Sequence, residues 1–187
     1  MKAARTTATA LAIWLLAGIS GCGYNTMVEE RTAVERAWAD VDAQLQRRND
    51  LVPNLVQTVK GYAKHEEKVF TAVAEARSKV AGAPTAQGKI AAAGELSGAL
   101  SRLLAVAERY PELKADRTFI RLSDELAGTE NRIAVARTRY NGAVETYNSS
   151  VAKFPGLITA RLFHFEKKPF FEAAPVSKEA PKVDFGG

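Results

Sequence analysis

The sequence predicts an all-α protein, an antiparallel up-down-up-down bundle of four long helices. Apolar residues recur at three- and four-residue spacing from residue 27 to residue 151, which is the periodicity of helices packed along a seam. Short segments with turn-forming residues separate the runs, and short connections favour antiparallel neighbours. Alanine, leucine, glutamate, arginine and lysine recur throughout, and all of them favour helix. No alternating strand pattern competes with this periodicity.

The first 22 residues have the features of a leader. Two basic residues, Lys2 and Arg5, precede an uncharged run over residues 8–19. At about a dozen residues, this run is shorter than the ~20 that a helix needs to cross a bilayer. The order of a basic start and a short apolar run is typical of a secretory signal peptide.

The only cysteine of the chain, Cys22, directly follows this leader. Residues 19–22 read Ile-Ser-Gly-Cys, which resembles a bacterial lipobox. In that pathway the Cys22 thiol is acylated, so membrane lipid is the first expected partner, and two or more acyl chains make the attachment stable. We expect residues 1–21 to be a lipoprotein signal peptide and residues 22–26 a lipidated tether. The alternative is an uncleaved signal anchor.

The expected location is a membrane, on its extracytoplasmic face. Gly23, not aspartate, follows the cysteine, which in a Gram-negative cell favours the periplasmic side of the outer membrane. With a single cysteine, disulfide bonds play no part in the fold.

Residues 27–154 are predicted to form the bundle. The first run ends at 47–50, where Asp50 is a candidate N-cap and Pro53 can occupy a first helical turn. Alternatively, the first two runs form one helix kinked at Pro53. The later breaks are predicted at residues 81–84 and Pro111. The four runs extend over residues 27–45, 52–80, 93–110 and 119–151.

Beyond the bundle, residues 155–187 are predicted to form a short helix and a flexible tail. The apolar pattern weakens after Pro155, although residues 157–165 can form one more short helix. Two further prolines and a Gly-Gly end favour flexibility in residues 173–187.

Residues 47–66 carry the strongest family signature. They read RRNDLVPNLV at 47–56 and VKGYAKHE at 59–66, and they are followed by YPELKA at 110–115 and TENRIA at 129–134. In these motifs the chain resembles the LemA family, with further matches that extend the resemblance over residues 24–172. The resemblance implies a membrane-tethered, extracytoplasmic helical bundle without established enzymatic activity. Members of the family usually have an N-terminal transmembrane helix. This sequence differs, because it has a lipobox-like segment in that place.

No catalytic constellation, cofactor site or metal site is indicated by the residues. The two histidines, His65 and His164, are far apart, and His65 lacks the second histidine of a zinc-protease helix. Charges of both signs are scattered, so the net charge of +5 does not indicate nucleic-acid binding. We expect no enzyme activity.

Glu66 lies in the apolar stripe of the second run, where a carboxylate must pair, bind a cation or lose its charge. One interpretation is a buried salt bridge with Arg102 or Arg121. The alternative is an interior metal or ligand site with Glu130 and His65, which would make the protein a small-ligand or metal-binding bundle.

Two motif-like segments are predicted to meet at the bundle tip farthest from the lipid. Their polar residues either cap helices or present a docking surface to an unknown envelope protein, so the leading hypothesis is a non-enzymatic interaction or scaffold module. On that hypothesis, charge reversal at Arg47 and Arg48 abolishes partner binding and leaves thermal stability nearly unchanged. The residues of this predicted tip are Arg47, Arg48, Asn49, Asp50, Tyr110 and Lys114.

Overall fold

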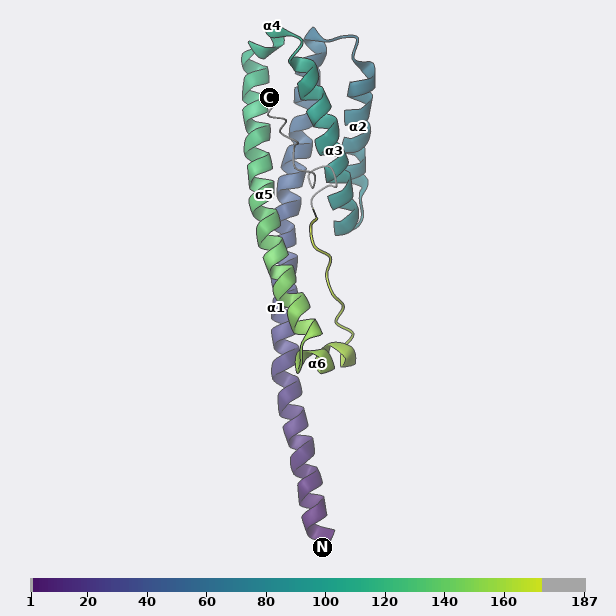
Figure 1. The fold of residues 1–187 in the computed structure, drawn as a ribbon, viewed down its shortest axis with the longest axis vertical. Helices are drawn as coiled ribbons and strands as arrows, with labels where there is room; N and C mark the ends of the chain where they lie inside the picture. The colour runs from purple at the N-terminus through teal and green to yellow at the C-terminus, as the bar shows by residue number, and fades with distance from the viewer. Residues whose placement is uncertain (1, 173–187) are drawn as a thin grey trace, which may run out of the picture. The chain divides into compact units, whose positions relative to one another are not determined.

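The computed structural model describes the backbone of residues 2–172 and the side chains of residues 23–172, and it contains only helices and irregular segments there. The all-α class is therefore confirmed, whereas the up-down-up-down order stays a prediction. The helices (Figure 1) are α1 (Lys2–Tyr62), α2 (Glu67–Gly82), α3 (Ala86–Ala107), α4 (Pro111–Lys114), α5 (Arg117–Ala152) and α6 (Gly156–Leu162).

The predicted interruption at residues 47–50 is wrong. Helix α1 continues through this segment and through Pro53 to Tyr62. Asp50 consequently caps no helix; its carboxylate lies inside α1 and accepts a hydrogen bond from Gln46 Nε2 at 2.8 Å. The alternative of one helix through Pro53 is correct up to Tyr62, and the chain breaks instead between Tyr62 and Glu67.

The other helix ends follow local capping chemistry. Helix α2 ends at Gly82, inside the predicted break. Thr85 caps α3, because its hydroxyl accepts the Gly88 N–H at 3.0 Å. Asp116 precedes α5 and its carboxylate accepts the Phe119 N–H at 2.8 Å. These polar side chains satisfy backbone donors that have no partner inside the helix.

The chain divides into two compact units. Unit 1 comprises Met1–Ala39 and Thr138–Phe170, and unit 2 comprises Asp40–Arg137 and Phe171–Gly187. Helices α1 and α5 each contribute residues to both units. The side chain of Cys22 lies outside the described residues, so the signal peptide, the lipidation and the domain bounds drawn from them stay predictions.

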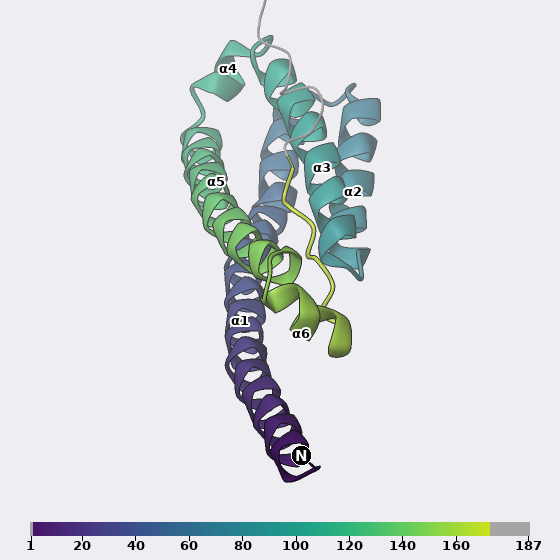
Figure 2. The same ribbon diagram turned by 60° about the horizontal axis from the view of Figure 1, so that its bottom comes forward.

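Unit 2 has an apolar core to which five helices contribute. Helices α2 and α3 lie side by side in it (Figures 1 and 2). By length and composition alone α3 could cross a membrane, but its buried leucines explain its apolar character within this core. The largest buried side chains of the cluster include Val52, Leu55, Val59, Phe70, Val73, Leu96, Leu100, Leu103, Leu113, Phe119, Leu122 and Leu126.

Unit 1 is built from the N-terminal part of α1, the C-terminal part of α5, α6 and the segment after it. Helix α6 lies beside α1 at the end of α5 (Figure 2). The rings of Trp38 and Tyr140 meet edge to face, with 5.5 Å between their centroids. The buried apolar side chains of this unit are Met27, Val34, Tyr140, Val144, Tyr147, Val151, Ala160 and Phe165.

Candidate functional site

A buried arginine joins three helices of unit 2. Arg48 of α1 is only 2% exposed, and its Nη1 donates to Glu130 Oε1 of α5 at 2.8 Å and to Ser97 Oγ of α3 at 2.9 Å. Its Nη2 donates to the Ala93 carbonyl of α3 at 3.0 Å. A guanidinium presents several donors in a fixed plane, so one side chain can hold two neighbouring helices at a defined register.

The position of Arg48 follows from the α1 seam. Val41, Leu45, Val52 and Leu55 are buried, and Arg48 occupies the place that continues their four-three spacing. The helix therefore carries its charged residue into the core along the same stripe as the apolar ones. A buried charge needs a partner with opposite charge, and Glu130 provides it.

A second buried polar contact compensates for Pro53. Proline has no N–H, so the carbonyl of residue 49, four residues earlier in α1, has no donor within the helix. Arg77 of α2 supplies one, because its Nε donates to the Asn49 carbonyl at 3.1 Å. Asn49 is 2% exposed, so this contact satisfies a carbonyl that water does not reach.

The predicted tip residues are not gathered on one surface. Arg48 and Asn49 are buried in unit 2, which corrects their assignment to a docking surface. A charge reversal at Arg48 would put two carboxylates side by side and so would not test docking. Arg47, Asp50 and Lys114 are exposed, while Tyr110 is partly buried and precedes α4. Lys114 Nζ pairs with Glu108 at 2.7 Å.

Glu66 lies at the turn before α2 rather than on a continuous core stripe. Its Oε1 accepts from Arg109 Nη2 at 2.7 Å, and the Glu66 side chain is 23% exposed. Glu66 does form a salt bridge, but the pair is exposed rather than buried, and the predicted partners Arg102 and Arg121 are wrong. The proposed companions of a metal site lie elsewhere: His65 is exposed and Glu130 binds Arg48. Among the described residues, no three metal-ligating side chains cluster.

An arginine-lined groove on unit 2 was not predicted. It is a hollow of about 500 Å³ between Arg47 of α1 and one face of α5. Arg132 is fixed at its edge by hydrogen bonds to Gln44 and Thr129. The groove residues are Arg47, Arg117, Ile120, Arg121, Asp124, Glu125, Gly128 and Arg132.

Among the described residues, none of the four arginines of the groove pairs with a carboxylate. Arg47, Arg117 and Arg121 are exposed and form no ion pair with another residue of the described part of the chain. Ile120 lies among them with 45% of its side chain exposed. An apolar residue within a group of guanidinium groups is suited to bind an acidic, partly apolar segment.

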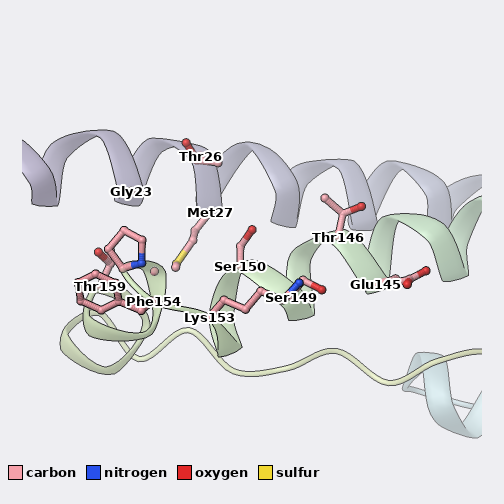
Figure 3. A pocket seen from close by; sticks show the side chains of 12 residues that line it. Gly23, Thr26, Met27, Glu145, Thr146, Ser149, Ser150, Lys153, Phe154 and Thr159 are labelled. Atoms are coloured by element: carbon pink, nitrogen blue, oxygen red, sulfur yellow. The ribbon is translucent and has the colours of Figure 1, made fainter.

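Unit 1 contains a larger cavity of about 960 Å³ between α1, α5 and α6. Figure 3 shows Met27 pointing from α1 toward Phe154 and Thr159. The other polar side chains of the wall are hydroxyl groups, the Glu145 carboxylate and the Lys153 ammonium. The lining residues are Gly23, Thr26, Met27, Glu145, Thr146, Ser149, Ser150, Lys153, Phe154, Pro155, Gly156 and Thr159.

Polar side chains of α5 hold the segment after α6. Asn148 forms two hydrogen bonds to Lys168, one to its carbonyl and one from its N–H, both at 2.8 Å. The Tyr140 hydroxyl donates to the Pro169 carbonyl at 2.8 Å, and burial raises the pKa of this tyrosine. Tyr140 and Asn148 thus satisfy backbone groups of the segment after α6. Burial also raises the pKa of Tyr147, whose hydroxyl has no partner among the described residues.

The fold and these contacts define a class: an all-helical protein whose buried polar groups join helices, with charged grooves on its surface. The LemA family matches residues 37–185 of this sequence. The chain therefore belongs to the LemA family, as its motifs indicated.

The curated relatives include magnetosome proteins. Magnetosome protein MamQ 2 of Paramagnetospirillum magneticum is 28% identical, over 81% of this chain and 65% of the relative. Magnetosome protein MamQ of Magnetospirillum gryphiswaldense is 26% identical over the same shares. Protein LemA of Metamycoplasma hominis is 19% identical, over 82% of this chain and 71% of its own. The chain thus spans slightly less than two thirds of the length of the MamQ proteins.

Proposed function

We propose that this protein is a membrane-tethered, non-enzymatic interaction module of the bacterial envelope, and that the arginine-lined groove of unit 2 binds an acidic segment of an envelope protein. The observation that carries the proposal is the group of exposed arginines around the exposed Ile120, none of which pairs with a carboxylate of the described residues. Guanidinium groups bind carboxylates through paired, charge-assisted hydrogen bonds. A buried apolar contact at the centre of such a surface adds affinity.

The internal contacts of unit 2 support a binding role for this groove. Arg48 and Arg77 bind groups of neighbouring helices, and Arg109 pairs with Glu66 in the turn before α2, so these arginines contribute to folding rather than to recognition. Arg47 is adjacent to Arg48 in the sequence but faces the groove. The RRND motif thus supplies one arginine to the core and one to the surface.

The membrane tether is the second part of the proposal. Helix α1 contains the apolar leader and continues without interruption into both units, so attachment at Cys22 would fix this helix to the bilayer. Mass spectrometry of the protein from its native membrane is expected to find acylated Cys22 and no residues before it. A Cys22→Ser variant that remains as firmly membrane-bound, or an unmodified Cys22, would contradict the lipid tether.

Photo-crosslinking in the native membrane tests the groove. A photoreactive amino acid at Ile120 is expected to give a discrete adduct with an envelope protein, whereas the same group at Val135 is not. Val135 is the matched control, because it is also exposed on α5 within unit 2 but lies outside the groove. Equal adducts at both positions, or none at Ile120, would contradict the proposal.

Charge reversal tests the chemistry of recognition. Arg47→Glu with Arg121→Glu is expected to remove the Ile120 adduct without lowering the thermal stability. Arg102→Glu is the control, because Arg102 is exposed in the same unit and lies outside the groove. Loss of the adduct in the control as well would assign the effect to net charge rather than to the groove.

A further inference from the structure

Exposed apolar side chains concentrate around α6. Nine large apolar side chains are exposed in the described part of the chain. Four of the nine belong to residues 154–163, and a fifth, Tyr24, lies against this segment. The four are Phe154, Ile158, Leu162 and Phe163, with exposed fractions of 80%, 61%, 64% and 48%.

Two of these side chains, Ile158 and Leu162, give α6 an apolar outer face, and Phe154 and Phe163 flank the helix. Ile158 and Leu162 are four residues apart and therefore share one side of the helix. Thr159 and Ala160 are buried on the opposite side. A short helix normally buries its apolar residues, so an outward apolar face marks a surface that meets another apolar medium.

The segment that carries this apolar face is rich in basic residues. Residues 153–168 contain four lysines and arginines and one acidic residue, Glu166. Arg161 extends from α6 itself, between the two exposed aliphatic residues. The four basic residues are Lys153, Arg161, Lys167 and Lys168. Segments that lie in the headgroup region of anionic bilayers typically combine apolar side chains with flanking lysine and arginine.

Helix α6 is held against the residues that follow the predicted lipidation site. A Cβ at Gly23 would lie 3.0 Å from the Thr159 hydroxyl oxygen, so the backbone of α1 lies close to the Thr159 side chain of α6 there. The Tyr24 ring packs on Phe163 and Phe165, with 4.8 Å and 5.7 Å between centroids. Cys22 is the residue immediately before this contact. Any bilayer anchored at Cys22 would therefore reach α6.

Close packing prevents α6 from turning its apolar face inward. A Cβ at Gly156 would lie 2.3 Å from the Ser150 carbonyl oxygen and 2.9 Å from Met27 Cε. Only a residue without a side chain fits at the start of this helix. The orientation of the exposed face is thus set by backbone contact within unit 1.

We propose that Phe154, Ile158, Leu162 and Phe163 form a membrane-docking face that inserts into the headgroup region of an anionic bilayer, with Lys153 and Arg161 on lipid phosphates. This inference rests on the membrane attachment of the proposed function and adds a second, non-covalent contact to it. It is independent of the arginine-lined groove. The bilayer is favoured over a protein partner because the face adjoins the predicted anchor and is bordered by basic residues.

Fluorescence of the full chain in vesicles tests the docking face. A dansyl-bearing amino acid is introduced at Ile158 or Leu162, and at exposed Arg36 of the same unit as the control. The vesicles contain phosphatidylethanolamine and phosphatidylglycerol, with part of the lipid carrying a nitroxide on its acyl chain. Quenching by nitroxide is expected to be at least about twofold stronger at residues 158 and 162 than at residue 36, and quenching by aqueous iodide weaker.

A charge-reversal pair tests the role of the basic residues. With the label at Ile158, Lys153→Glu and Arg161→Glu together are expected to reduce nitroxide quenching to the level of the Arg36 label. The matched pair Arg36→Glu and Arg139→Glu makes the same change of charge at exposed positions of unit 1 and is expected to leave it unchanged. Equal losses in both pairs would overturn the assignment of Lys153 and Arg161.

The outcomes separate this inference from the tether. If the full chain does not co-migrate with the vesicles in a flotation gradient, both the lipid tether and the docking face are contradicted. If the chain co-migrates with the vesicles but the lipid nitroxide quenches the labels at residues 36, 158 and 162 equally, only the docking face is contradicted. Labels at residues 158 and 162 that are shielded from both iodide and nitroxide would show that a second copy of the chain covers the face, which also overturns the inference.

Discussion

Arg77 Nε donates a hydrogen bond to the backbone carbonyl of Asn49 at 3.1 Å, and this contact explains how α1 passes through a proline without ending. Pro53 removes the donor that this carbonyl would otherwise use. The side chain of a neighbouring helix replaces it. The stability of α1 at this point therefore depends on α2.

This relationship predicts a coupling between Arg77 and Pro53. Arg77→Met keeps most of the aliphatic stem but leaves a buried carbonyl unsatisfied, which costs about 1–3 kcal/mol. Pro53→Ala restores an N–H to α1, so Arg77→Met is expected to cost at least about 1 kcal/mol less in that background. Urea unfolding of the full chain in detergent measures the four free energies.

Arg102→Met is the control for the loss of an exposed arginine in unit 2. Its effect is expected to stay within about 0.5 kcal/mol in either background. Equal costs of Arg77→Met with and without Pro53 would contradict the donor role of Arg77.

The Arg48–Glu130 pair predicts that removing the charge of Glu130 alone destabilises the protein more than removing both charges. Glu130→Gln leaves the buried Arg48 charge without a carboxylate. Because the Glu130 side chain is 43% exposed and partly screened, the expected loss is about 1–3 kcal/mol rather than that of a fully buried pair. Arg48→Met combined with Glu130→Gln is expected to recover most of this loss, since no charge then remains buried.

Chemical unfolding of these variants checks the prediction. Glu125→Gln removes an exposed carboxylate from the same helix and is expected to change stability by less than about 0.5 kcal/mol. A double variant as unstable as Glu130→Gln would mean that the shape of Arg48, rather than its charge, determines the packing of unit 2.

The all-helical class and most helix ends were predictable because they depend on local chemistry. The Gly82 break and the end of α5 near Phe154 have turn or cap signals in the sequence itself. The continuity of α1 through residues 47–50 also had a signal, since Leu45, Arg48 and Val52 keep the spacing of three and four residues. The periodicity was missed because the residue at the middle position, Arg48, is charged rather than apolar.

The break after Tyr62 and the surface sites depend on tertiary contacts and were not predictable. Glu66 was assigned to a core stripe, yet its carboxylate lies at a turn, where it pairs with Arg109 of the turn after α3. The arginine-lined groove is formed by residues of α1 and α5. Predicting it would require knowing how each of these two helices is rotated about its own axis. The burial of Arg48 likewise depends on Glu130, 82 residues away.

Asp116 predicts a pH dependence of stability. The hydrogen bond from the Phe119 N–H holds the pKa of Asp116 below its ordinary value of 3.8. A lowered pKa in the folded state contributes stability that is fully present above the unfolded value, and that is lost as the pH falls through the folded value. The contribution of the Asp116 charge should thus decline only below pH 3.8.

Asp116→Asn tests this, because asparagine retains a capping oxygen but does not titrate. Wild type is expected to be more stable than the variant at neutral pH, and the difference is expected to shrink toward about pH 2. Asp40→Asn, at an exposed position inside α1, serves as the control and should give a smaller change between the two pH values. A wild-type advantage that is the same at both pH values would contradict the role of the charge.

Two glycines predict opposite effects of the same substitution. A Cβ at Gly156 would meet the Ser150 carbonyl oxygen at 2.3 Å, and a backbone atom cannot move aside as a flexible side chain can. Gly156→Ala is therefore expected to destabilise the protein by about 1–3 kcal/mol. Gly142, inside α5, has no atom within 4 Å of its Cβ position, so Gly142→Ala is expected to stabilise it by about 0.5–1 kcal/mol.

Thermal and urea unfolding of both variants measure these effects, and the position of α6 gives a second readout. If Gly156→Ala displaces α6, the Tyr24–Phe163 ring contact is lost and limited proteolysis should cut between residues 153 and 165 faster than in Gly142→Ala. A Gly156→Ala protein as stable and as resistant as wild type would mean that α6 is not seated against the Ser150 carbonyl, and the fixed orientation of its apolar face would then have no structural basis.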